Sequence, residues 1–290
     1  MRSSVQRNSG SSFTVERTFA LILLELTLSM TLFIACSNDS DGSQIADDEG
    51  SSSTTAEAAL DLPQGSEAVD LEPADFTTNI NNPWWPMEPG TRWTYREIDE
   101  DGKEVKVVVI VTTETKKIAN GITARVVRDT VTEDGELIED TKDWYAQDSE
   151  GNIWYLGEDT AEFEDGKLTT KAGSFEAGVD GALPGIIMPA DPQPGMKYRQ
   201  EYYEGEAEDN GEIVSLNEMA EVPFGQFEDV LLTKDTITIE PDVLEYKLYA
   251  KGVGPVLVLG VSGGGGREEL LRGDRAPASA GTGPLGRPSR

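Results

Sequence analysis

Carboxyl groups are the most abundant side chains in this sequence that could do acid–base chemistry. Its 290 residues include 54 Asp and Glu, 24 Lys and Arg, one Cys and no His. A Ser-His-Asp triad, a Cys-His pair and a His-ligated zinc or haem all need an imidazole, so none of these sites can be built here. The enzymatic hypothesis that remains is a hydrolase that uses two carboxyl groups, as glycoside hydrolases do.

Several carboxylates lie near aromatic residues that could stack on a sugar ring. They are Asp140, Asp143, Glu158, Asp159, Glu162 and Glu176. In a chain with so many acidic residues, nearness in the sequence does not select a pair. We therefore name no catalytic residue and no cofactor, favour a protein that is not an enzyme, and keep a carboxylate-dependent hydrolase as an alternative.

Aromatic and apolar side chains point instead to a binding site. Two aromatic pairs, Trp144–Tyr145 and Trp154–Tyr155, flank a predicted turn at Gly151. Alternation along the strands places one member of each pair inside and one outside. The outward members could form an aromatic platform. The segment 173–195 adds more apolar mass than an exposed loop should carry, so it either plugs the mouth of the fold or lines a site. The candidate ligand-binding residues are Trp144, Tyr145, Trp154, Tyr155, Phe175, Asp180, Leu183, Ile187 and Met188.

The acidic turns raise the question of a metal site. Aspartate and glutamate oxygens in a loop bent by glycine are ligands that Ca²⁺ accepts, and residues 148–152 are the best example. None of these turns has the spacing of a calcium-binding loop that ends in a bidentate Glu. We therefore interpret them as structural turns and predict no metal site.

The charge of the chain restricts its partners. A formal net charge of -30 at pH 7 repels nucleic acid phosphates and anionic lipid head groups. We expect no nucleic acid partner. Contact with a membrane is expected only through the N-terminus.

Residues 1–35 have the features of a bacterial lipoprotein signal peptide. Three arginines precede an apolar stretch from Phe19 to Ala35, which is too short and too interrupted for a secure membrane span and ends at Cys36. The last residues before Cys36 resemble a lipobox, in which the cysteine is acylated after export. We expect an exported protein anchored to the outer leaflet of the cell membrane, or to the outer membrane in a diderm host.

Regular turns and β-branched residues predict an all-β fold. Gly102, Gly121, Gly135, Gly151 and Gly166 each follow Asp, Glu or Asn, and the runs between them are rich in Val, Thr, Ile, Tyr and Trp. Strands of about 10–13 residues would fill these spacings, and strands longer than usual must twist and curl. We predict a single antiparallel meander, strongly curved or barrel-like, with one long Gly/Pro-rich loop at 173–195 and a further hairpin turn at Asn210 and Gly211.

Composition divides the rest of the chain. Residues 36–75 are acidic, lack Lys and Arg, and are predicted to be a disordered tether. Residues 76–262 are predicted to be the all-β domain. Residues 263–290 begin with four glycines and are predicted to be a disordered tail.

Six motifs resemble an uncharacterised family of exported bacterial proteins and lipoproteins. They are GTRWTY (90–95), DWYAQD (143–148), GNIWYLGE (151–158), GVDGA (178–182), YRQEY (198–202) and YAKGVG (249–254). The resemblance covers about residues 82–262. It implies export and implies no activity, cofactor or catalytic residue.

Three functional hypotheses follow. The leading one is a non-catalytic binding module for a small apolar ligand or a protein partner, and the second is an envelope structural or assembly protein without a small-molecule site. The third is the carboxylate-dependent hydrolase. An enclosed cavity above roughly 300 Å³ with an apolar lining would favour the first, and a filled interior the second.

Overall fold

The computed structural model describes residues 62–99, 102–263 and 266–289. The predicted signal peptide, Cys36 and most of the predicted tether lie outside the described residues, and so does Arg290. Within the described part of the chain, no helix is both long and apolar enough to cross a membrane.

The fold is all-β, as predicted. One 3-10 turn, η1 (Pro73–Asp75), precedes fifteen strands that pair antiparallel in one sheet. The strands are β1 (Thr91–Asp99), β2 (Glu104–Lys117), β3 (Thr123–Glu133), β4 (Glu136–Gln147), β5 (Ile153–Glu164), β6 (Lys167–Thr170), β7 (Phe175–Glu176), β8 (Leu183–Met188), β9 (Lys197–Arg199), β10 (Glu201–Tyr202), β11 (Asp209–Val222), β12 (Gly225–Ile237), β13 (Leu244–Ala250), β14 (Gly254–Ser262) and β15 (Gly266–Arg275).

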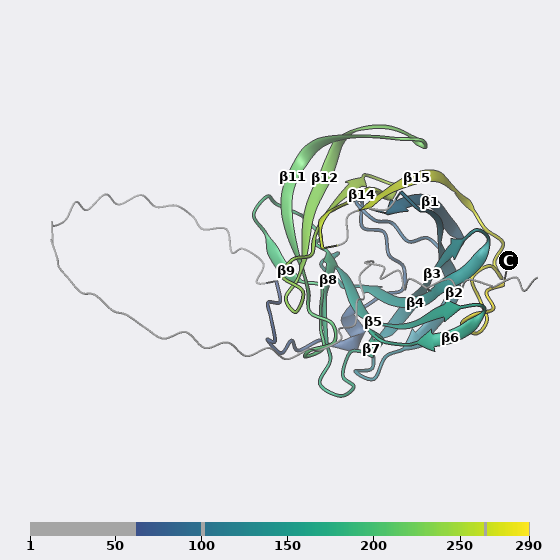
Figure 1. The fold of residues 1–290 in the computed structure, drawn as a ribbon. Coiled ribbons are helices and arrows are strands. Elements are labelled where there is room, and N and C mark those ends of the chain that lie inside the picture. The colour runs from purple at the N-terminus through teal and green to yellow at the C-terminus, as the bar shows by residue number, and fades with distance from the viewer. Residues whose placement is uncertain (1–61, 100–101, 264–265, 290) are drawn as a thin grey trace, which may run out of the picture. The chain divides into compact units, whose positions relative to one another are not determined.

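Five of the six predicted hairpin turns are confirmed. The connections after β1 to β5 contain Gly102, Gly121, Gly135, Gly151 and Gly166, and each glycine has a positive φ. The strands between them are long, 11 to 14 residues for β2 to β5. Strands of this length twist strongly, which explains why the sheet in Figure 1 curls round on itself.

The two ends of the sheet meet, so the fold is close to a closed barrel. The strand order is β10-β8-β5-β4-β3-β2-β1-β15-β14-β13-β12-β11-β9. The two terminal strands of this order, β9 and β10, are separated in the chain only by Gln200. The backbone N of Gln200 donates to the carbonyl O of Asp209 over 2.7 Å. One short segment therefore pairs with both edges of the sheet.

The predicted turn at Asn210 and Gly211 is wrong, because both residues lie inside β11. The turn comes earlier, at Gly205, where Tyr203 bridges to Ala207. Gly211 serves a different purpose: a Cβ added to it would lie 2.5 Å from the ring of Tyr198 on the paired strand β9. A glycine here leaves the space that the ring of Tyr198 occupies beside the backbone of β11.

The segment 173–195 differs from the structureless loop that we predicted. It contains β7, which pairs with β5, and β8, which pairs with both β5 and β10. Close backbone approach explains its glycines better than flexibility does, since a Cβ at Gly185 would meet the carbonyl O of Gln200 at 2.3 Å. This segment builds part of the sheet instead of covering its mouth.

The C-terminal boundary was also wrong. Residues 266–275 form β15, which lies in the middle of the strand order between β1 and β14. Leu270 on this strand is fully buried. Arg92 on β1 forms a bidentate ion pair with Asp274 on β15, in which Nε and Nη2 donate to the two carboxylate oxygens. The glycine run that suggested disorder follows the end of β14 at Ser262, and its last residue, Gly266, is the first residue of β15.

Residues after β15 pack on the sheet through one buried arginine. Arg128 is 1 % exposed and pairs with Asp140, which is fully buried, with Nη2 2.5 Å from Oδ2. The remaining guanidinium donors reach the carbonyl oxygens of residues 281–284. The backbone N of Gly286 donates to the same Asp140 carboxylate.

The N-terminal boundary shifts in a similar way. Residues 62–75, which we assigned to the tether, are ordered against the sheet, and Leu62 is buried. Arg199 explains the attachment, because its Nη1 donates to the carbonyl oxygens of Gly65 and Glu67. Its Nε and Nη2 donate to the carbonyl of Pro184 on β8.

Candidate functional site

The curved sheet surrounds a partly open cavity of about 220 Å³. Its walls come from β1 to β5, β8, β10, β11 and β13 to β15, so nearly the whole strand order contributes. The cavity is smaller than the roughly 300 Å³ that we set for an apolar-ligand site, and acidic residues interrupt its apolar lining. The interior is therefore neither filled nor wholly apolar.

Trp85 crosses the interior between opposite walls. Its ring centroid lies 5.7 Å from that of Tyr145 on β4 and 5.8 Å from that of Tyr249 on β13. The segment that carries it is tied at both sides, since Asn82 Nδ2 donates to the carbonyls of Gly151 and Pro189 while Gly252 N donates to that of Pro83. This Pro-rich segment, and not 173–195, spans between the walls.

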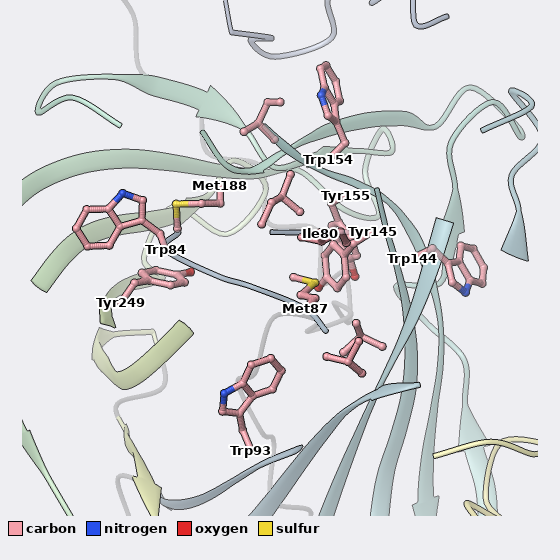
Figure 2. Close-up of a cluster of buried hydrophobic side chains, with 14 of the residues drawn as sticks. Ile80, Trp84, Met87, Trp93, Trp144, Tyr145, Trp154, Tyr155, Met188 and Tyr249 are labelled. Atoms are coloured by element: carbon pink, nitrogen blue, oxygen red, sulfur yellow. The ribbon is translucent and has the colours of Figure 1, made fainter. Parts of the chain in front are cut away.

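Aromatic rings form a second part of the lining. Tyr145 and Tyr155 stack with ring centroids 5.0 Å apart, and Trp93, Tyr95 and Trp85 complete the set with Tyr249. Figure 2 shows Tyr145 and Tyr155 side by side, with Trp144 and Trp154 apart from them. The prediction that one member of each pair points inward is confirmed.

Eight carboxyl groups and one ammonium group line the same cavity. The acidic residues are Asp129, Glu139, Asp143, Glu158, Glu201, Asp209, Glu245 and Glu268, and the cation is Lys247. Lys247 Nζ lies 2.9 Å from Asp235 Oδ2 and 3.6 Å from Glu245 Oε2. It therefore already has partners, and Asp143, Glu158, Glu201 and Asp209 share the cavity with no second Lys or Arg among its lining residues.

Tyr155 joins two of these carboxyl groups. Its hydroxyl lies 2.9 Å from Asp143 Oδ1 and 2.8 Å from Glu158 Oε2. A phenol has one proton, so Tyr155 donates to only one of them. The second contact is a hydrogen bond only when that carboxyl group is protonated and donates to the phenol oxygen.

A β-bulge explains how Tyr155 and Glu158 reach the same side of the sheet. Asp143 on β4 pairs with Glu158 on β5, and Tyr145 pairs with Tyr155. The two pairs are two residues apart on β4 but three residues apart on β5, so β5 contains one extra residue. The extra residue reverses the alternation, so two side chains three positions apart both face the cavity. Gly157 sits in the bulge with φ 129°, and a Cβ there would meet the carbonyl O of Phe175 at 2.3 Å.

Burial raises the pKa of the acidic residues in the cavity. For Glu268, burial and then the charges of Glu97 and Glu245 raise the pKa to about 8. Burial raises the pKa of Asp209 to about 7, against the lowering effect of Lys247. Burial likewise raises the pKa of Glu158 and Glu201 well above the usual range, and neighbouring carboxylates add to it.

These pKa directions predict that the protein loses stability as the pH rises. The unfolded chain ionises its carboxyl groups near about pH 4, whereas the folded protein keeps protons on Asp209 and Glu268 up to about pH 7 and 8. The folded state thus binds more protons between these values, and the free energy of unfolding decreases through that window. Urea unfolding should show a decrease on the order of 4 kcal/mol from pH 6 to pH 8.

Exposed carboxylates are already ionised at pH 6, so this interval reports on buried groups. Glu268→Gln should reduce the decrease, and Glu221→Gln, at an exposed position of β11, should leave it unchanged. A free energy of unfolding that is constant or increases from pH 6 to 8 would show that the buried acids are ionised throughout.

Six of the nine predicted ligand-binding residues line one of two hollows. Tyr145, Tyr155 and Ile187 line the interior cavity. Trp144, Phe175 and Asp180 line a second hollow of about 290 Å³ on the other face of β4 and β5. Glu158 lies in the wall that the two hollows share.

The remaining predicted residues, Trp154, Leu183 and Met188, line neither hollow. Trp154 Nε1 donates to Asp148 Oδ2 over 2.7 Å, and its ring meets Phe76 edge-on. Trp144 is covered separately, by the ammonium of Lys116, 3.7 Å from the ring centroid. The two outward tryptophans are both buried and do not form an exposed platform.

The acidic turn at 148–152 is built by hydrogen bonds. Asp148 Oδ1 accepts from the backbone N of residues 150, 151 and 152, and Oδ2 accepts from Asn152 Nδ2 and Trp154 Nε1. Both oxygens are thus engaged by N–H donors. This is the structural turn that we predicted.

Among the six carboxylates considered for hydrolysis, the structure brings Asp143 and Glu158 together in the cavity. Asp140 is bound to Arg128, Asp159 to Lys171 and Glu176 to Lys116. The hydrolase alternative would therefore depend on the pair that shares the hydroxyl of Tyr155.

Most acidic residues of the cavity were missed by sequence reasoning. The signal was present as alternation, because Val127, Asp129 and Val131 occupy successive inward positions on β3. The same period places Glu245, Lys247 and Tyr249 inward on β13.

Comparison with known proteins gives a limited result. No family model and no curated protein matches the chain. Among solved structures, the chain is similar to a candidate exported protein with a YmcC-like fold from Bacteroides fragilis, at 15% identity and a TM-score of 0.41, over 66% of this chain and 99% of that one. It is also similar to a candidate lipoprotein from Parabacteroides distasonis, at 11% identity and a TM-score of 0.33, over 66% of this chain and 98% of that one. At these scores neither similarity carries an argument about function.

Proposed function

We propose that the protein is an exported, lipid-anchored binding module that holds a small ligand inside its curved sheet. The cavity carries this proposal. It is built by side chains from eleven strands and by Trp85 and Gln200, and its volume suits a ligand smaller than a drug-sized molecule. Its aromatic walls supply contact area, so we expect the ligand to have an apolar or aromatic body.

Polar groups that face the cavity support a ligand over a purely structural role. Glu201 and Glu268 are 5 % and 9 % exposed and have no hydrogen-bond or ion-pair partner among the residues that the structure describes. Trp85 Nε1 and Asp129 Oδ1 are likewise buried without a partner in the described chain. Buried polar groups without partners cost stability, which an envelope protein with a purely structural interior has no reason to accept.

The anchor is the second part of the proposal. Acylation of Cys36 would hold the described domain outside the cell membrane at the end of a chain segment of 25 residues, positions 37–61, that lies outside the described residues. The net charge of -30 supports attachment through the lipid and not through the surface of the domain, because anionic head groups repel it.

Native mass spectrometry of the protein purified from its own host tests the binding function. We expect a host-derived adduct of small mass on the wild-type protein. Val109→Trp should remove the adduct, because Val109 lines the cavity and a larger side chain occupies the ligand volume. Val108→Trp is the matched control, since Val108 lies on the opposite face of the same strand and does not line the cavity.

An adduct that persists in Val109→Trp would place the ligand elsewhere. A wild-type protein that carries no adduct would favour the envelope structural role.

A further inference from the structure

The acidic half of the cavity carries information on the chemistry of the ligand. Glu201 lies in β10, at the closure of the sheet, with Asp143 on β4, Glu158 on β5 and Asp209 on β11 around it. Lys247 is the cationic group that faces this cluster, and it is bonded to Asp235 and Glu245 on its other side. The cluster is therefore short of positive charge.

We infer that the cavity binds a small organic cation, with the ligand's ammonium group at Glu201 and the Asp143–Tyr155–Glu158 cluster and its apolar body against Trp85 and Tyr145. This inference rests on the proposed function and specifies its ligand class. It stands on two observations that are independent of each other.

The first observation is the state of Glu201. Its side chain is more than nine-tenths buried, lines the cavity, and has no hydrogen-bond or ion-pair partner within the described residues. In its ionised form Glu201 accepts hydrogen bonds and does not donate them, so the complement that stabilises this form inside the cavity is a donor that carries positive charge. An ammonium group fulfils both conditions.

The second observation is the aromatic wall beside the carboxyl groups. Tyr145 stacks on Tyr155, and Trp85 lies 5.7 Å from Tyr145, so the faces and edges of three rings surround the same region. Ring faces attract cations, and the attraction increases where water is excluded. A neutral or anionic ligand would gain less from these rings and would leave the carboxyl cluster unpaired.

Proton balance follows from the geometry at Tyr155. Without a cation, the hydroxyl can satisfy both Asp143 and Glu158 only if one of them holds a proton. An ammonium group brings N–H donors of its own, so that proton is released to solvent when the cation binds. Binding should therefore be accompanied by proton release and should strengthen as the pH rises.

The experiment compares three probes of the same shape by calorimetry on the full chain. 2-Phenylethylamine carries an ammonium group, 2-phenylethanol a hydroxyl group, and phenylacetate a carboxylate. At pH 7.5 we expect the amine to bind at least tenfold more tightly than the alcohol, with no measurable binding of phenylacetate. The affinity for the amine should increase at least fivefold from pH 5.5 to pH 7.5, with proton release, while that for the alcohol stays constant.

Two variants link the effect to the cluster. Glu201→Gln should reduce the preference for the amine over the alcohol at least fivefold, and Glu221→Gln should leave the preference unchanged as an exposed acidic control on β11. If Glu201→Gln folds poorly, Tyr155→Phe provides the second test, because it removes a hydrogen bond that lowers the pKa of Asp143 and Glu158. The pH at which the affinity for the amine increases should therefore shift upward, and an unchanged pH dependence would contradict the role of this cluster.

The outcomes separate this inference from the proposed function. If the alcohol binds as tightly as the amine or more tightly, and Val109→Trp blocks that binding, the inference that the ligand is a cation is wrong, whereas the cavity remains a binding site. If the amine does not bind, the inference that the ligand is a cation is also wrong. The proposed binding function then depends only on whether the host-purified protein carries an adduct.

Discussion

A chain that ends at Ser262 is expected to lose cooperative folding. The truncation removes β15, which pairs with β1 over nine residue positions and with β14 over four. Two long strand edges would lose their hydrogen bonds at once, each bond contributing about 0.5–1.5 kcal/mol, and the summed loss is comparable with the whole stability of a domain. Thermal unfolding followed by circular dichroism on the truncated and full chains measures the effect.

A point substitution on the same strand gives the graded control. Leu270 is fully buried, and Leu270→Ala should lower the free energy of unfolding by about 2–5 kcal/mol while the transition stays cooperative. If the truncated chain unfolds cooperatively and its free energy of unfolding lies within about 1 kcal/mol of that of the full chain, residues 266–275 are not required for folding.

The second large effect is expected at Asp140. Asp140→Ala leaves the Arg128 guanidinium buried without its carboxylate, and the free energy of unfolding should fall by about 3–5 kcal/mol. Arg128 is 1 % exposed, so solvent cannot replace the lost partner. Urea denaturation of the variant and the wild type at constant pH measures the change.

An exposed ion pair provides the comparison for Asp140. Lys197 Nζ lies 3.7 Å from Glu212 Oε2 and its side chain is 66% exposed, so Lys197→Ala should cost less than about 1 kcal/mol. Proteolysis adds a local measurement. Because Arg128 also holds the carbonyls of residues 281–284, Asp140→Ala should make cleavage after β15 faster. Equal effects of the two substitutions would mean that burial of the Arg128–Asp140 pair does not govern its contribution.

The sequence alone determined the fold class and several exclusions. Long β-branched runs and Gly-containing turns are local signals, and their spacing was enough to place β1 to β5 and the connections between them. The absence of His is a property of composition and needs no structure, so the exclusion of imidazole chemistry was complete at once. Alternation along β4 and β5 was also local, and it predicted that one member of each aromatic pair faces the interior; the structure shows that these are Tyr145 and Tyr155.

Gly211 and the C-terminal strand show where local signals mislead. An Asn-Gly pair in the sequence is compatible with a tight turn and also with a strand position at which an aromatic ring approaches the glycine. Only the position of Tyr198 on the neighbouring strand shows that Gly211 is the second case. Residues 266–275 have a polar, Gly-flanked composition that suggests disorder. They are ordered because two distant strands, β1 and β14, provide hydrogen-bond partners on both sides.

The candidate site was decided by tertiary structure. The bulge at Gly157 turned Glu158 inward against the alternation that the sequence predicts, and the closure of the sheet brought Glu201 beside Asp143 and Glu158. Whether a carboxyl group is a solvated surface charge or a buried group with a raised pKa depends on which segments surround it. Those segments lie tens of residues apart in the chain, so the sequence contains the acidic residues of the cavity but no local signal that gathers them around it.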